Sequence, residues 1–87
     1  MAKYSVLYTE AFYKSLEPIP KKDITRILRK TENLAEDPRP PGSQKLAGQE
    51  RYRVRQGNYR IIYKIEDARL IVVVVKVCHR REVYDRG

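Results

Sequence analysis

The sequence predicts a small α+β domain with the element order β-α-α-β-β-β, in which two N-terminal helices pack on one face of a mainly antiparallel sheet. Two observations predict this fold. Apolar residues recur with helical spacing only in the first half of the chain, and three strand-like segments joined by tight turns fill the second half. With 87 residues, the chain is long enough for one domain and too short for two. We therefore predict a single domain spanning residues 1–87, with a thin core and a shallow groove rather than a deep pocket.

The first half of the chain should form one strand and then two helices. Lys3–Tyr8 is rich in Tyr, Val and Leu, which is typical of a strand. Thr9 is a candidate N-cap for a helix that Pro18 and Pro20 end. The second helix should run from about Pro20 to Glu36, with a basic face opposite a buried stripe. The stripe consists of Ile24, Ile27, Leu28, Thr31, Leu34 and Ala35.

The second half should form a loop and then three strands. Asp37–Gly48 contains three prolines and two glycines, so it is predicted to be a loop. Tight turns are expected at Gly57-Asn58 and near Asp67-Ala68. Leu70–Val75 is apolar at every position, which predicts a strand that is covered on both faces and central in the sheet. The predicted strands are Tyr52–Gln56, Tyr59–Ile65 and Leu70–Cys78.

Charge and cysteine content narrow the class of protein. Nineteen lysines and arginines against eleven aspartates and glutamates give a net charge of +8, which favours polyanionic partners, with nucleic acid first and acidic proteins second. Cys78 is the only cysteine, so no intrachain disulfide can form and a reducing cytoplasm fits best. No signal peptide is recognisable, and the longest apolar run is far too short to cross a bilayer. We therefore expect a cytoplasmic protein without membrane partners.

Arginines cluster in the segment RYRVRQGNYR, residues 51–60. A two-residue loop at Gly57-Asn58 would place Arg55 opposite Arg60, and alternation would bring Arg53 to the same face. Like charges in directly opposite positions are destabilising. The cluster is therefore either a solvated basic face or a phosphate clamp, because the planar fork of arginine matches phosphate oxygens. The opposite face, expected to form the core under the helices, carries Tyr52, Val54, Ile61 and Tyr63.

The tail VCHRREVYDRG, residues 77–87, adds a second group of candidate site residues. His79 is the only histidine, and histidine is the side chain that ordinarily titrates near neutral pH, so it is either a surface residue or an acid–base catalyst. Tyr84 either caps the core or stacks on an exposed base. Arg80 and Arg81 either contact RNA or form no more than a charged chain end.

The segment KLAGQERYRVRQGNYRIIYKIED, followed by VVVKVCHRREVY, resembles the RelE branch of the RelE/ParE toxin superfamily over nearly the whole chain. The similarity is carried by the Lys45-Leu46 pair, by the YRVR and GNYR motifs and by HRREVY. The resemblance implies a RelE-like fold and a type II toxin that cuts messenger RNA in the ribosomal A site. In that chemistry the ribose 2′-hydroxyl attacks the neighbouring phosphate, and no metal or cofactor takes part.

The resemblance also implies partners and site residues. A cognate acidic antitoxin would cover the basic groove, the ribosome would present the mRNA, and operator DNA would be bound only by the toxin–antitoxin complex. Matched position by position, the family's basic site residues fall on the predicted hairpin and on the tail, where Arg81 is the alternative to Arg80. The expected catalytic residues are Arg53, Arg55, Arg60, His79, Arg80 and Tyr84, and the expected further RNA contacts are Lys45, Arg51 and Arg81.

The chain departs from prominent family members, which have lysines in place of Arg53 and Arg55 and a longer spacing before the tyrosine. Arginine stays protonated, so it stabilises transition-state charge but is a poor proton acceptor. We therefore hypothesise that His79 supplies acid or base function, as a histidine does in the YoeB branch, with Tyr84 as the competing proton carrier. The weaker base candidates, which neighbouring arginines would engage in ion pairs, are Glu50 and Glu82.

Two rival functions stay open from the sequence. A ParE-like toxin of the same superfamily would poison DNA gyrase and need not be a nuclease. A non-catalytic RNA-binding module would use the same basic face for affinity alone. The HRREVY ending and the clustered hairpin arginines favour the ribonuclease.

Overall fold

The computed structural model describes residues 3–48 and 50–79, and its helices and strands follow the predicted order with one short strand added. None of the described helices is long and apolar enough to cross a membrane. The elements are β1 (Ser5–Tyr8), α1 (Glu10–Ser15), α2 (Lys21–Asn33), β2 (Gln44–Lys45), β3 (Arg51–Gln56), β4 (Tyr59–Glu66), the 3-10 turn η1 (Asp67–Arg69) and β5 (Ile71–His79).

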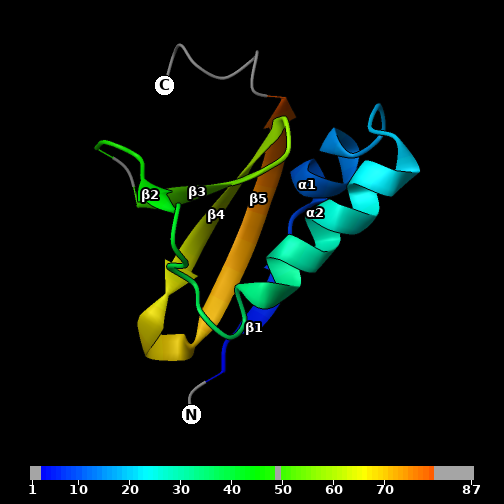
Figure 1. Cartoon of the computed structure of the whole chain (residues 1–87). Helices are drawn as coiled ribbons and strands as arrows, with labels where there is room; N and C mark the ends of the chain where they lie inside the picture. The colour runs from blue at the N-terminus through cyan, green and yellow to red at the C-terminus, as the bar shows by residue number, and fades with distance from the viewer. Residues whose placement is uncertain (1–2, 49, 80–87) are drawn as a thin grey trace.

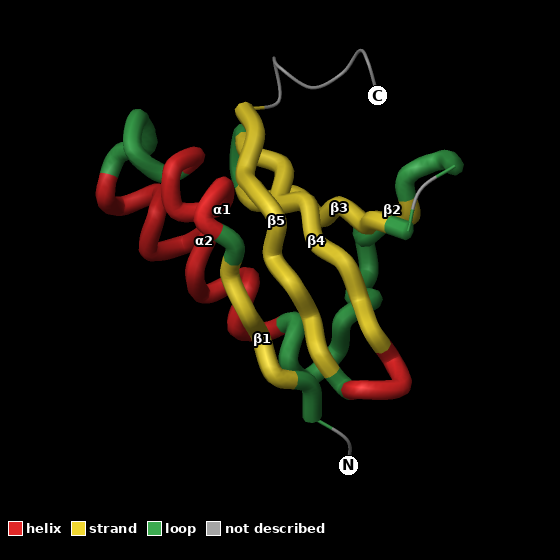
Figure 2. The backbone as a smooth tube through the Cα atoms, turned by 180° about the vertical axis from the view of Figure 1, so that it is seen from behind, coloured by secondary structure: helices red, strands yellow, loops and turns green. Residues whose placement is uncertain are grey.

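The strands form one five-stranded sheet in the order β1-β5-β4-β3-β2. Neighbouring strands are antiparallel except for β1 and β5, which are parallel. Both helices lie on one side of the sheet (Figure 1), and the view from behind shows the strands from the side that no described element covers (Figure 2). The predicted α+β architecture is therefore confirmed.

The core lies between the two helices and the sheet. Phe12 of α1, Ile27 of α2 and the C-cap residue Leu34 are buried there, and Ile27 and Leu34 belong to the helical stripe that the sequence predicts. Thr31 is buried as well, and its hydroxyl donates to the Leu28 carbonyl at 2.7 Å, so the polar group is satisfied within the helix. The sheet contributes Val54, Ile61, Tyr63, Val72, Val74 and Val77 to the same core.

Strand β5 is central in the sheet, as predicted, but only one of its faces is covered. It lies inside the sheet between β1 and β4, as expected for a strongly apolar strand. Val72 and Val74 are buried under the helices, whereas Ile71, Val73 and Val75 on the other face are only half-buried. The prediction of two covered faces is wrong, because an interior strand needs both backbone edges paired but not a second layer over it.

Two local boundaries also differ from prediction. The predicted loop Asp37–Gly48 contains β2, whose Gln44 pairs opposite Arg53. The last strand begins at Ile71 because Leu70 adopts a left-handed φ of 55° at the end of η1. This conformation is uncommon for a residue with a side chain, and the strand signal in the sequence does not reveal it.

A β-bulge interrupts the pairing of β4 with β5. Ile62 lies opposite Lys76, and the next residue, Tyr63, lies opposite Val74. Val75 is therefore an extra residue on β5, and beyond it the strand exchanges the faces on which its side chains emerge.

Helix α1 holds this bulge in place. The Thr9 hydroxyl donates to the Val75 carbonyl at 2.6 Å and also accepts from the Phe12 N–H at 3.0 Å, which caps the helix. The Ser15 hydroxyl accepts from the Val77 N–H at 3.1 Å. Backbone groups that the interrupted ladder leaves unpaired thus find partners on the helix.

Arg39 ties the loop between α2 and β2 to the far end of the sheet. Its guanidinium donates to the two carboxylate oxygens of Asp67 at 3.2 and 3.0 Å, and its Nε donates to the Tyr52 hydroxyl at 3.3 Å. Tyr4 donates to the same carboxylate at 2.7 Å. Hydrogen bonds from Arg39 and then from Tyr4 lower the pKa of Asp67 below its ordinary value. The loop that leads to Gln44 is therefore anchored.

Candidate functional site

The hairpin of β3 and β4 has the register that the sequence predicts. Arg55 lies opposite Arg60, and Arg53 lies opposite Ile62. The two-residue loop begins at Gly57, whose φ of 61° is accessible to glycine without steric cost. Arg53, Arg55 and Arg60 therefore emerge together on the side of the sheet away from the helices, and we call these three residues the arginine face.

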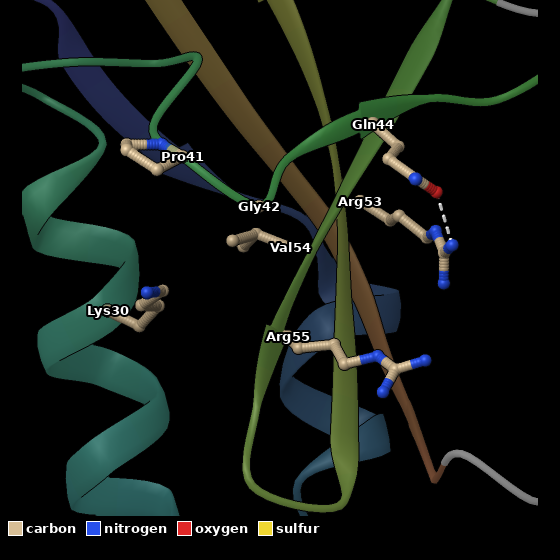
Figure 3. A pocket seen from close by; sticks show the side chains of 7 residues that line it. All are labelled: Lys30, Pro41, Gly42, Gln44, Arg53, Val54 and Arg55. Atoms are coloured by element: carbon tan, nitrogen blue, oxygen red, sulfur yellow. Dashed lines mark hydrogen bonds between the residues drawn. The ribbon is translucent and has the colours of Figure 1, made fainter.

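A close view shows this separation of faces directly. Arg53 and Arg55 point to one side of β3, and Val54 between them points to the other side, toward α2 (Figure 3). Val54 is 2% exposed in the core. The predicted division of the hairpin into a basic face and a core face is confirmed.

The charges of the arginine face lie close enough to affect one another. The pKa of Arg53 is lowered from its ordinary value, first by burial and then by the positive charges of Arg60 and Arg55. The Arg53 Nη1 atom is buried and has no hydrogen-bond partner among the described residues. A buried donor of this kind is costly for the fold, and an anion bound at the face would satisfy it.

Gln44 is a site residue that the sequence does not reveal. Its side-chain oxygen accepts a hydrogen bond from Arg53 Nη2 (Figure 3). The register of β2 places Gln44 on the arginine face and turns Lys45 to the opposite face. A neutral amide thus orients Arg53 without neutralising it. Only the pairing of β2 exposes this contact, since the segment has the composition of a loop.

Two further predicted RNA contacts occupy different places. Arg51 lies opposite Lys64 on the side of the arginine face and is half-buried. Lys45 is exposed and forms an ion pair with Glu50 at 3.8 Å. Glu50 is thus the partner of a lysine on β2 rather than of the hairpin arginines.

The end of β5 brings Cys78, and not His79, to the arginine face. Cys78 lies opposite Arg60, and His79 lies opposite Tyr59, on the side of the sheet that carries the core. The His79 ring packs edge-on against the Tyr59 ring with 5.4 Å between centroids. His79 is therefore near the hairpin turn but turned away from the three arginines. Arg80, Arg81, Glu82 and Tyr84 lie outside the described residues.

A cavity of about 270 Å³ lies beside the arginine face, between α2 and the edge of β3 (Figure 3). Lys30 of α2 stands across it from the hairpin, whereas the side chains of Arg53 and Arg55 point away from α2. Its lining residues are Lys30, Pro41, Gly42, Gln44, Arg53, Val54 and Arg55. In the described part of the chain, no three His, Cys, Asp or Glu side chains gather as a metal site would require. The donors present suit an anion.

The basic sheet face and the fold together define a class of small toxins. Residues 6–84 match the model of the family described as "ParE toxin of type II toxin-antitoxin system, parDE". The chain therefore belongs to the RelE/ParE superfamily of type II toxins, as the motifs in its sequence predict.

Individual relatives make the likeness more specific. Toxin RelG of Mycobacterium tuberculosis is 29% identical over 87 residues, which cover 95% of this chain and 98% of the relative. Among solved structures, the archaeal RelE-RelB complex from Pyrococcus horikoshii has a chain 28% identical, with a TM-score of 0.80 and coverage of 95% and 100%. A chain of the toxin-antitoxin complex RelBE2 from Mycobacterium tuberculosis is 25% identical, with a TM-score of 0.80 and coverage of 90% and 99%.

Proposed function

We propose that this toxin is an endoribonuclease that cleaves mRNA in the ribosomal A site and so inhibits translation. The observation that carries the proposal is the arginine face, where three guanidinium groups emerge together. Burial and then the charges of Arg60 and Arg55 lower the pKa of Arg53 there. Attack of a ribose 2′-oxygen on the adjacent phosphorus builds negative charge on the phosphoryl oxygens. Guanidinium groups that are already in place stabilise that charge without reorganisation in the transition state.

The proposed reaction needs no metal or cofactor. The 2′-oxygen forms a bond to phosphorus while the bond to the 5′-oxygen breaks, which leaves a 2′,3′-cyclic phosphate and a 5′-hydroxyl. One group must accept the 2′-hydroxyl proton, and another must protonate the leaving 5′-oxygen. Arginine does neither well, so Arg53, Arg55 and Arg60 have electrostatic roles.

We assign proton transfer to residues of the segment 77–87. His79 is our candidate for acid or base function, with Tyr84 as the competing proton carrier or as a platform for a base. The edge-on contact with Tyr59 turns the His79 ring away from the arginine face, so the proposed role requires the reacting RNA to reach the end of β5. Arg80, with Arg81 as the alternative, would add a further phosphate contact.

The open form of the arginine face supports a role for the ribosome. A shallow basic face binds RNA phosphates but does little to orient one scissile bond. Presentation of the mRNA by the ribosome would supply that orientation.

We further propose a cognate acidic antitoxin as the protein partner. The similar Pyrococcus horikoshii and Mycobacterium tuberculosis structures are of toxin–antitoxin complexes. A net charge of +8 favours an acidic partner on the arginine face. Operator DNA would then be bound only by the complex, and the toxin would act in the cytoplasm without membrane partners.

Mapping of mRNA 5′ ends tests the proposed activity. Purified toxin is added to a translation extract and, in a parallel reaction, to the same mRNA without ribosomes. We expect new 5′-hydroxyl ends at codon spacing in the translated mRNA only. Intact mRNA in both reactions, at a toxin concentration that arrests growth when expressed, would contradict the proposal.

Inhibition of DNA gyrase is the second candidate, because the matched family model is described as a ParE toxin. Gyrase supercoiling in the presence of the purified toxin distinguishes the two activities. Stalled gyrase together with intact translated mRNA would assign the chain to the second activity, and normal supercoiling together with codon-spaced cuts to the first.

A further inference from the structure

We propose that Lys76 of β5 is a fourth cation of the RNA-binding surface and contacts a backbone phosphate next to the one held by the arginine face. This inference rests on the proposed function for its ligand, single-stranded RNA. Lys76 lies in the segment that resembles the family but outside the short motifs that carry the similarity. Strand periodicity alone would point its side chain into the core.

The β-bulge determines where Lys76 points. Val72 and Val74 are buried under the helices, so strict alternation would place residue 76 there as well. The extra residue Val75 shifts the phase, and Val77 takes the buried position at 6% exposure. Lys76 consequently emerges on the open side of the sheet and is exposed. Bulges commonly re-aim a side chain in this way next to functional sites.

The bulge is fixed by contacts from an element distant in sequence. The Thr9 N–H donates to the Val74 carbonyl at 3.1 Å, and the Thr9 hydroxyl donates to the Val75 carbonyl at 2.6 Å. Ser15 accepts from the Val77 N–H at 3.1 Å on the other side of the lysine. The N-cap and the last residue of α1 thus hold the backbone on both sides of Lys76. These hydrogen bonds fix the direction in which the Lys76 side chain points.

The register places Lys76 among the arginines. Lys76 lies opposite Ile62, and Ile62 lies opposite Arg53, so the three side chains form one row across β5, β4 and β3. Arg60 is two residues from Ile62 on β4 and is therefore a diagonal neighbour of Lys76, at a typical separation of about 7–8 Å. Ile62 is only 7% exposed although it faces the open side of the sheet.

The charges around Lys76 also favour an anionic ligand. Within the described part of the chain, the ion pairs involve Lys3, Arg39, Lys45 and Arg69, and none of them engages Lys76. A lysine turned toward a row of arginines adds repulsion to the free protein. A polyanion that runs across β3, β4 and β5 would offset this repulsion at each phosphate.

Salt-dependent RNA binding tests the proposal. Lys76→Gln is compared with Lys22→Gln, which removes the same charge from the exposed side of α2. One lost phosphate contact should lower the slope of log K against log salt by about 0.7, which corresponds to roughly fivefold weaker binding of a short single-stranded RNA near 0.1 M salt. We expect this change for Lys76→Gln, wild-type behaviour for Lys22→Gln, and restored binding for Lys76→Arg.

Each outcome bears on the proposal. If Lys76→Gln has the same slope and affinity as Lys22→Gln, or if the wild type binds no single-stranded RNA, the assignment is wrong. If a folded Lys76→Arg binds as weakly as Lys76→Gln, a charge contact is also excluded. Codon-spaced cleavage is measured separately, so a toxin that binds RNA through Lys76 but cuts no mRNA would refute the proposed function and leave this inference standing.

Discussion

Arg39 and Arg53 lie on two sides of the same small sheet and have opposite environments. Arg39 meets Asp67 and Tyr52, and the hydrogen bond to Asp67 is the main reason that its pKa is raised. Arg53 is partly buried beside Arg55 and Arg60, and its pKa is lowered. An arginine whose charge is matched within the chain stabilises the fold. An arginine placed against like charges destabilises it and is available to an external anion.

The other contacts of Arg39 and Arg53 also differ. The Arg39 guanidinium lies 5.2 Å from the centre of the Tyr52 ring, which stacks in turn on Tyr63 with 5.9 Å between centroids. The contact of Arg39 with the Tyr52 ring favours the cation. Gln44 holds Arg53 by one hydrogen bond and adds no opposite charge. Arg39, in the loop before β2, therefore has a charged partner within the chain, whereas Arg53 on β3 is held by a neutral one.

Alanine substitution of the two arginines should give opposite results, and this is the largest effect that we expect. Arg53→Ala or Arg60→Ala should slow single-turnover mRNA cleavage by about 1,000-fold and relieve toxicity, because transition-state charge loses a preplaced donor. Arg39→Ala should leave the rate within a few-fold and lower the free energy of unfolding by about 1 kcal/mol. Cleavage kinetics and urea unfolding of the same preparations give both values.

Arg29→Ala is the matched control, since it removes an exposed arginine from α2 without touching the sheet. The comparison between Arg39 and Arg53 fails if a folded Arg53→Ala protein still arrests growth. It also fails if Arg39→Ala abolishes cleavage in a protein that keeps its unfolding midpoint.

His79→Gln should have the next largest effect. If His79 carries a proton, single-turnover cleavage should slow by about 100-fold. The affinity for single-stranded RNA should change little, since the ring lies against Tyr59 and not on the arginine face. An unchanged rate would remove His79 from the mechanism and leave Tyr84, which Tyr84→Phe then tests.

Gln44→Glu should make Arg53 resemble Arg39. The substitution places a carboxylate at the position that already accepts a hydrogen bond from Arg53, so an ion pair forms and the pKa of Arg53 rises. We expect a small gain in stability, and cleavage and RNA binding about tenfold weaker, because part of the positive charge is neutralised. Gln56→Glu on the core side of the same hairpin is the control for added negative charge. Tighter RNA binding by Gln44→Glu would contradict the role assigned to Gln44.

The hairpin could be predicted because its register depends only on residues that are close together in the sequence. A two-residue loop fixes which residues pair, and alternation then sends three arginines to one side and the apolar residues to the other. The helical stripe of α2 is predictable for the same reason. The family was recognisable because these local motifs occur in a fixed order along the chain.

The rest of the site depends on contacts between distant segments. The bulge at Val75 is held by Thr9, 66 residues away, and a uniformly apolar strand gives no sign of a change in phase. Without the bulge, alternation would bring His79 to the arginine face and send Lys76 into the core. Strand β2 is similarly invisible, because a loop-like segment becomes a strand only through pairing with β3. The sequence therefore identifies the arginine cluster but not its two neighbours, Gln44 and Lys76.

The stability at acid pH tests the ion pair between Arg39 and Asp67, and its loss should be the smallest effect that we expect. The folded-state pKa of Asp67 is lowered, so its pairing with Arg39 contributes stability that is present above the ordinary carboxyl range, near pH 4, and is lost as the pH falls through the folded value. Asp67→Asn should therefore lower the urea midpoint slightly at pH 7, and the difference from the wild type should vanish at the acid end. Glu17→Gln, an exposed carboxylate on the helical side, should show no such convergence. A difference that stays constant from pH 7 to the acid end would mean that Asp67 acts through packing rather than charge. The contrast between Arg39 and Arg53 would then lose its electrostatic basis.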